Sequence, residues 1–192
     1  MRKAQMISVS AALLLLLGAN AQDKRTAKAK RDPKSQLAHV HDFDWEIGDW
    51  NVHLRRLQHP LTGSKSWTEY DGPAHVRKLW NGRANLLELE LNGPAGHIEG
   101  LSPRLYNPQS QRWSVYFATS DNGALRTPMV GQFQDDRGEF SDRELYHGKK
   151  IDLHFAFSEV TEKSFHGEQS FSPDGGKSWE ANWIEDFTRA GP

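Results

Sequence analysis

The chain has 192 residues, a formal net charge of −1 and no cysteine. Without cysteine, disulfides, thiolate metal sites and cysteine nucleophiles are all excluded. From residue 38 onward, 16 Lys and Arg stand against 23 Asp and Glu, and this net charge of about −7 does not favour nucleic acid as a partner.

Residues 1–21 have the layout of a signal peptide. A short positive start with Arg2 and Lys3 precedes the apolar run Leu13–Leu17, and Ala19-Asn20-Ala21 provides small residues for cleavage. The apolar run is shorter than the roughly 20 residues of a membrane-spanning helix, so no integral span is expected after cleavage. The sequence therefore predicts a periplasmic or secreted protein.

Residues 22–41 predict a flexible leader, because they are rich in Lys and Arg and nearly free of apolar side chains. A solvated spacer is the favoured interpretation, with contact to anionic lipid or cell-wall polymer as the alternative. His39, His41, Asp42 and Asp44 form the one dense cluster of metal-capable side chains in the sequence, but a metal ion needs three or four fixed ligands. Neither a metal site nor a cofactor is predicted.

Residues 42–190 predict one domain of antiparallel β-strands. Apolar side chains recur with a period of two, as in residues 50–54 and 87–91, and turn signals such as Asn92-Gly93 and Asn122-Gly123 separate the runs. No long amphipathic helix interrupts them, which favours an up-and-down, calycin-like barrel of about 8–10 strands over a sandwich. The expected strands are 50–58, 65–72, 74–81, 84–92, 97–106, 112–119, 128–134, 138–146, 150–158, 163–172 and 179–189.

The two ends of this domain resemble the lipocalin-like, or calycin, barrels. Gly48-Asp49-Trp50 matches the Gly-x-Trp motif that opens their first strand, and Arg189 matches the arginine of their last strand. The resemblance implies that Arg189 lies across Trp50 and closes the barrel base, where a weakly hydrated guanidinium is attracted to the indole face.

The stretch 42–189 is also similar to a family of uncharacterised exported bacterial proteins. The shared features are Phe43-Asp44-Trp45 before the Gly-x-Trp motif, Arg55-Arg56-Leu57 after it, and a closing Asp-Gly-Gly hairpin. This resemblance implies a fold and an exported location but no established activity.

The segment Ser172–Trp179 resembles the Asp-box of sialidase-like propellers. In that motif the aspartate accepts turn amides, the glycines allow positive φ and the tryptophan packs beneath the hairpin, so its role is structural. The sequence holds one copy and no repeat of 40 to 50 residues. A propeller is therefore not expected, and the segment is predicted to be a hairpin turn.

The expected functional site is the barrel interior. The residues expected on or near inward faces are Trp67, Trp80, Trp113, Trp183, Arg56, Arg104, Tyr116 and Glu185. A large aromatic surface with a few polar groups is typical of a small-molecule pocket, but the same aromatic residues could also fill the interior completely. A buried Glu185 would need a partner, and Arg56 and Arg104 are the candidates for an ion pair.

The sequence favours a protein that binds a small, mostly apolar ligand, with arginine available to meet an anionic group on it. The alternatives are an enzyme that uses the same cavity, with Glu185 or Tyr116 as acid or base, and a filled barrel that acts as an interaction module at the cell envelope. No hydrolase or phosphate-binding motif appears, so no catalytic residue is predicted and a binding protein is preferred to an enzyme. The sequence identifies neither the ligand nor an oligomeric state.

Overall fold

The computed structural model describes residues 39–191, and all structural statements below concern this part of the chain. The predicted signal peptide and residues 22–38 of the predicted leader lie outside it. The described residues confirm the all-β prediction, since the only helices among them are the short 3₁₀ turns η2 (Asp44–Glu46) and η3 (Trp80–Gly82). The strands are β1 (Gly48–Leu57), β2 (Trp67–Leu79), β3 (Ala84–Gly93), β4 (Gly96–Asn107), β5 (Arg112–Val115), β6 (Ala118–Thr119), β7 (Met129–Gln134), β8 (Arg137–Tyr146), β9 (Lys149–Ser158), β10 (Ser164–Ser172) and β11 (Glu180–Arg189).

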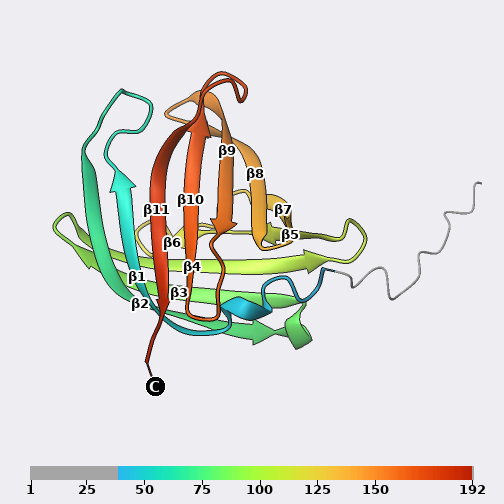
Figure 1. Ribbon diagram of the computed structural model, residues 1–192. Helices are drawn as coiled ribbons and strands as arrows, with labels where there is room; N and C mark the ends of the chain where they lie inside the picture. The colour runs from blue at the N-terminus through green and yellow to red at the C-terminus, as the bar shows by residue number, and fades with distance from the viewer. Residues whose placement is uncertain (1–38, 192) are drawn as a thin grey trace, which may run out of the picture. The chain divides into compact units, whose positions relative to one another are not determined.

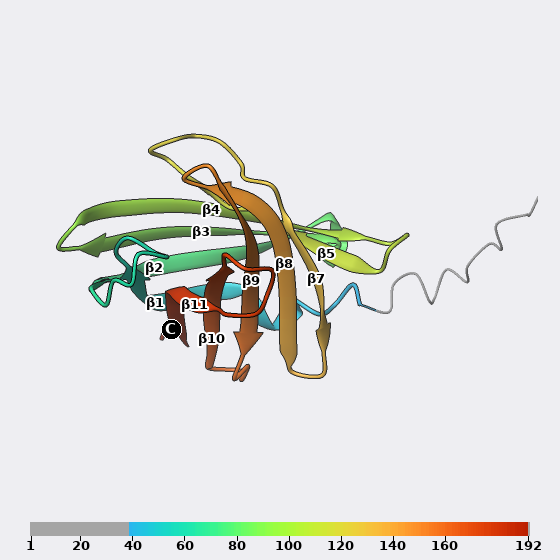
Figure 2. The ribbon, with the colours of Figure 1, turned by 90° about the horizontal axis from the view of Figure 1, so that it is seen from above.

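The strands form one closed antiparallel barrel. Apart from the short β6, each strand pairs with its neighbours along the chain, and the sheet closes because β1 also pairs with β11 (Figure 1). Strands β5 and β6 both pair with β4 and together act as one strand, so the barrel has ten. Seen from above, β3 and β4 lie across the barrel from β9 and β10 (Figure 2). Closure leaves no free sheet edge, which is how such a meander avoids pairing with other chains.

One predicted boundary is wrong. The expected strands 65–72 and 74–81 are a single strand, β2, which pairs with β1 without a break from Trp67 to Val76. The pairing of β2 with β3 skips Gly72 and Pro73, so the missing amide of Pro73 breaks no hydrogen bond there. Gly72 is needed for the close approach of β3, because a Cβ at this position would lie 2.0 Å from the Glu90 carbonyl oxygen.

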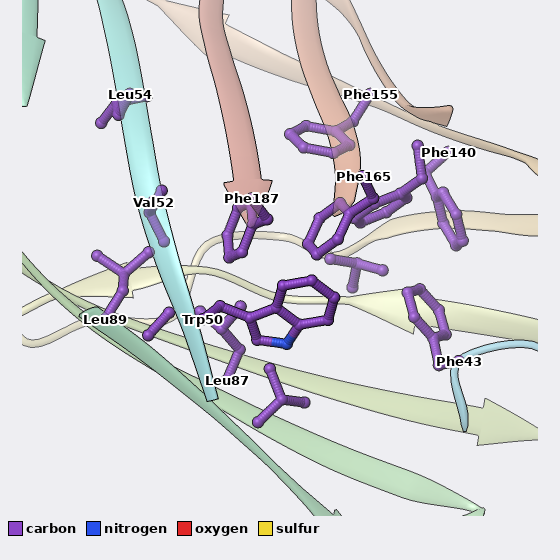
Figure 3. Packing of buried hydrophobic residues seen from close by; sticks show 14 of the residues in the cluster. Phe43, Trp50, Val52, Leu54, Leu87, Leu89, Phe140, Phe155, Phe165 and Phe187 are labelled. Atoms are coloured by element: carbon purple, nitrogen blue, oxygen red, sulfur yellow. The ribbon is translucent and has the colours of Figure 1, made fainter. Parts of the chain in front are cut away.

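The main core fills the lower half of the barrel with aromatic rings. The Trp50 ring lies beside Phe165 and Phe187, with Leu87 on another side (Figure 3). Ring centroids are 5.0 Å apart for Trp50 and Phe165 and 4.2 Å apart for Phe165 and Phe187. Such close edge and stacked contacts add to the burial of each ring. This end of the barrel is therefore packed by side chains.

The segment His39–Ile47 plugs the base of the barrel. Its Val40, Phe43 and Glu46 are buried. Two inward indoles bind its backbone, because Trp50 Nε1 donates to the Glu46 carbonyl at 2.7 Å and Trp113 Nε1 donates to the His39 carbonyl at 2.8 Å. The packed part of the described residues thus begins at residues 39–40, ahead of the first strand.

Arg189 at the end of β11 holds the plug in place. Its Nη1 donates to the Ile47 carbonyl at 2.7 Å and its Nη2 to the Trp45 carbonyl at 2.9 Å. The guanidinium carbon lies 3.8 Å from the centre of the Trp50 ring. This is the arrangement that the calycin resemblance implies.

Gly48 makes this approach possible. Its φ is +126°, and a Cβ there would lie 2.7 Å from Arg189 Nη1. A side chain would be strained by the backbone and would displace the guanidinium. The glycine of the Gly-x-Trp motif therefore has a direct physical role in closing the barrel.

The segment Ser172–Trp179 forms the turn between β10 and β11. Asp174 Oδ1 accepts from the amides of Lys177 and Ser178 at 3.0 and 2.9 Å, and Ser172 Oγ accepts from the Gly176 amide at 2.8 Å. The Ser178 hydroxyl also donates to Asp174 Oδ2 at 2.7 Å, and this hydrogen bond, together with that from the Ser178 amide, holds the pKa of Asp174 down at about 2. The segment is thus a hairpin turn, as predicted from its resemblance to an Asp-box.

Replacing Arg189 by lysine should destabilise the domain by about 2 kcal/mol, because lysine keeps the charge but cannot bind both carbonyls while covering the indole. Urea unfolding followed by circular dichroism measures this. Arg143→Lys is the matched control, since Arg143 lies on the outer face with its side chain 88% exposed. Equal midpoints for the two variants would contradict the proposed role of Arg189.

Candidate functional site

A cavity of about 330 Å³ occupies the barrel above the aromatic core. Its wall combines apolar and polar side chains, with contributions from strands on both sides of the barrel. Gln58, His59 and Pro60 of the β1–β2 connection lie at one end, together with Arg126 and Thr127 of the β6–β7 connection. The apolar lining residues are Leu57, Leu87, Leu89, Val115, Phe117, Met129, Leu153, Phe155, Phe157, Phe171 and Phe187.

Arg104 and Glu46 form a buried ion pair next to the cavity. Arg104 Nη2 lies 2.8 Å from Glu46 Oε1, with side-chain exposures of 3% and 0%. The guanidinium also lies between two rings, 5.3 Å from the centre of Phe43 and 5.9 Å from that of Phe157. Arg104 lines the cavity, whereas Glu46 lies behind it in the plug. The positive charge in the wall is therefore already paired.

Glu185 is the second carboxyl of this region. It lies on β11, lines the cavity and is 8% exposed. Its Oε2 accepts a hydrogen bond of 2.7 Å from Trp183 Nε1. Gly167 faces it on β10, and a Cβ there would lie 2.7 Å from Glu185 Cγ, so the glycine leaves room for this side chain.

Both carboxyls have raised pKa values. Burial raises the pKa of Glu46 to about 7, against the attraction of Arg104, and the charge of Glu185 adds to the rise. Burial also raises the pKa of Glu185, although the hydrogen bond from Trp183 and the charge of Arg104 oppose the rise. One guanidinium thus faces two carboxyls in a poorly solvated region, which favours keeping a proton there.

A β-bulge brings one more polar group to the wall. Gln169 pairs with Trp183 and Ser170 pairs with Ala181, so Asn182 is the extra residue on β11. Asn182 is buried and accepts a hydrogen bond of 2.8 Å from Gln169 Nε2. Both side chains line the cavity. The bulge therefore adds a second amide to a face that strict alternation would leave to Trp183 and Glu185.

Five of the eight side chains expected at the cavity line it, namely Arg56, Arg104, Tyr116, Trp183 and Glu185. The ion pair expected for Glu185 does not form. Of its two candidate partners, Arg104 pairs with Glu46, and Arg56 is exposed at the mouth of the cavity.

The other three tryptophans do not line the cavity, and their expected positions need correction. Trp67 begins β2 on the outer face that it shares with Glu69 and Asp71, and it is 37% exposed. Trp80 lies in η3 with φ +49°, where the strand alternation has ended, and it is 65% exposed. Trp113 does point inward, but it is buried at the base against Phe43, at a centroid distance of 5.0 Å.

Sequence reasoning missed several residues in the cavity wall or directly behind it. Glu46 stands in a 3₁₀ turn outside the predicted strands, and Asn182 faces inward only because of the bulge. Ser102 alternates with Arg104 on β4, so the period of two could have identified it. The missed polar residues of the wall are Gln58, His59, Ser102, Arg126, Thr127, Glu144, Tyr146, Gln169 and Asn182.

The histidine cluster of the predicted leader forms separate pairs. His39 Nδ1 lies 3.1 Å from Asp42 Oδ2, and His41 Nδ1 lies 2.9 Å from Asp44 Oδ2. Within residues 39–191, no three His, Asp or Glu side chains converge as a metal site would require. In the same residues, no helix has both the length and the apolar character to cross a membrane.

Comparison with known proteins identifies the fold but not the activity. No family model matches the chain, and no curated protein matches it. The S-type phycobiliprotein lyase CPES from Guillardia theta has a similar structure, with a TM-score of 0.55, 10% identity, and coverage of 83% of this chain and 97% of the lyase. The two proteins therefore share the barrel fold.

Two further structures are less similar. EF1p2_mFAP2b bound to DFHBI gives a TM-score of 0.44 at 9% identity and covers 80% of this chain and 100% of its own. A de novo designed fluorescence-activating β-barrel gives a TM-score of 0.41 at 11% identity, with coverage of 77% of this chain and 95% of the designed one.

The buried Glu46 should make stability depend on pH. Because its folded-state pKa of about 7 lies above the ordinary 4.5, the folded chain holds the proton more tightly, and stability falls as the pH rises through this window. The total loss is at most about 3 kcal/mol, since each pH unit between the two pKa values contributes roughly 1.4 kcal/mol.

Urea unfolding at pH 5, 6, 7 and 8 should show this slope in the unmodified protein and a flatter one in Glu46→Gln. The control Glu88→Gln, exposed on β3, should keep the original slope, and a Glu46→Gln slope as steep as the control's would contradict the assignment.

Proposed function

We propose that this protein is an exported calycin-like binding protein that takes a small, mostly apolar molecule into its barrel. The observation that carries the proposal is the cavity of about 330 Å³, whose wall combines aliphatic and phenylalanine side chains with polar groups. A concave site lined by apolar and aromatic side chains together with placed polar groups is typical of small-molecule sites. The signal-peptide layout of residues 1–21 supports a periplasmic or secreted location, and the resemblance to exported bacterial proteins supports it further.

The position of the cavity also supports binding. The base is sealed by the plug His39–Ile47 and the aromatic core, so the free space lies toward the other end of the barrel. A barrel filled throughout by side chains would leave no such space, so the interaction-module alternative is less well supported.

A neutral hydrophobic dye should test this proposal. N-phenyl-1-naphthylamine should bind the protein with micromolar affinity and gain fluorescence, because it would leave water for an apolar wall. Gln169→Trp, which places a bulky ring at the cavity wall, should weaken binding at least about tenfold, equivalent to about 1.4 kcal/mol. Thr188→Trp, on the exposed outer face of β11, is the matched control and should bind like the unmodified protein. A dye that does not bind, or that binds both variants equally, would count against the cavity as the site.

A further inference from the structure

The carboxyl of Glu185 has an unused hydrogen-bonding oxygen at the cavity wall. Its Oε2 accepts from Trp183 Nε1 at 2.7 Å. For Oε1, no hydrogen bond or ion pair is formed with any of residues 39–191. The side chain is more than nine-tenths buried and lines the cavity. A carboxyl oxygen that borders a cavity and has no donor from the protein is free to accept one from a bound molecule.

The cavity offers little free positive charge to compete for that oxygen. Arg104 is held by Glu46 at 2.8 Å, and Arg126 lies 3.8 Å from Glu144. Arg56 is exposed at the mouth. Deep in the cavity, the one guanidinium is therefore already balanced by a carboxyl, and an added anion would find no unpaired positive charge there.

The strand opposite is shaped around this carboxyl. Gly167 pairs directly with Glu185, and a Cβ at Gly167 would lie 2.8 Å from Glu185 Oε1 and 3.0 Å from Phe155 Cζ. Phe155 and Phe187 line the same space. The unused oxygen is thus an acceptor beside phenylalanine rings in a wall that also carries other polar side chains, and it would orient a ligand that carries a donor group.

We propose that the cavity selects an apolar molecule that carries a basic amine, whose N–H donates to Glu185 Oε1, and that it discriminates against carboxylates. This inference rests on the proposed function and adds the chemical class of the ligand. It reverses the expectation from sequence of an anionic group met by arginine. A neutral hydroxyl can donate to the same oxygen, but it lacks the charge that compensates a buried carboxylate, so it should bind less tightly than the amine.

Three probes with the same ten-carbon chain separate these classes: decylamine, decanol and decanoate. Each is titrated at pH 7 against the full-length mature protein loaded with N-phenyl-1-naphthylamine, and the displacement gives a Kd. We expect decylamine to bind most tightly and decanoate at least about tenfold more weakly. Decanoate binding as tightly as decylamine, or more tightly, would overturn the proposal.

Variants locate the selectivity at one residue. Glu185→Gln should weaken decylamine about tenfold and leave decanol within about twofold. Asp186→Asn is the matched control, because Asp186 is the next residue on β11 and faces outward, where it pairs with His166 at 2.7 Å. Unchanged decylamine affinity in a Glu185→Gln protein with native circular dichroism would overturn the assignment. If Glu185→Gln does not fold, the relative affinities of the three probes for the unmodified protein still test the proposal.

The outcomes distinguish this inference from the proposed function. If the dye binds and decanoate displaces it best, the cavity is a binding site for anions and only the present inference fails. If neither the dye nor any of the three probes binds, the proposed function itself fails.

Discussion

The contact of Arg189 with Trp50 and with the plug backbone is the constraint on which the rest of the structure depends. A single guanidinium covers the indole at 3.8 Å and donates to two carbonyls of the segment before β1. These carbonyls lie at the end of a 3₁₀ turn, where no strand partner is available. One side chain therefore joins the last strand, the first strand and the plug.

The sealed base determines where ligand space can exist. Aromatic rings occupy the lower barrel, and the buried pair of Arg104 with Glu46 marks its upper limit. A buried ion pair is a weak source of stability, because both charges lose their hydration. Here the ion pair matters for its position, because it places a paired guanidinium on the same cavity wall as Glu185, whose carboxyl forms no ion pair. Fold and site are thus connected through the plug.

The sequence predicts the fold well because a period of two and tight turns are local signals. It fails where a long-range feature changes the alternation. Gly72-Pro73 is typical of a break, yet β1 carries β2 through it as one strand. Trp80 follows the end of that strand, and Asn182 is the extra residue of a bulge defined only by pairing with β10. The sequence could place Glu185 inward by parity. It could not show that Arg104 pairs with Glu46, because the 3₁₀ turn that directs Glu46 toward Arg104 gives no periodic signal.

The linkage through Arg189 also has a consequence for the order of events during synthesis. Its hydrogen bonds to Ile47 and Trp45 connect positions 142 and 144 residues apart, nearly the full length of the domain. Contacts so distant in sequence form late and slow the search for the native topology. The N-terminal strand cannot complete its end of the barrel until the C-terminal strand has left the ribosome. The export proposed above would gain from such a delay, since a chain that crosses a membrane unfolded stays competent for translocation until β11 is available.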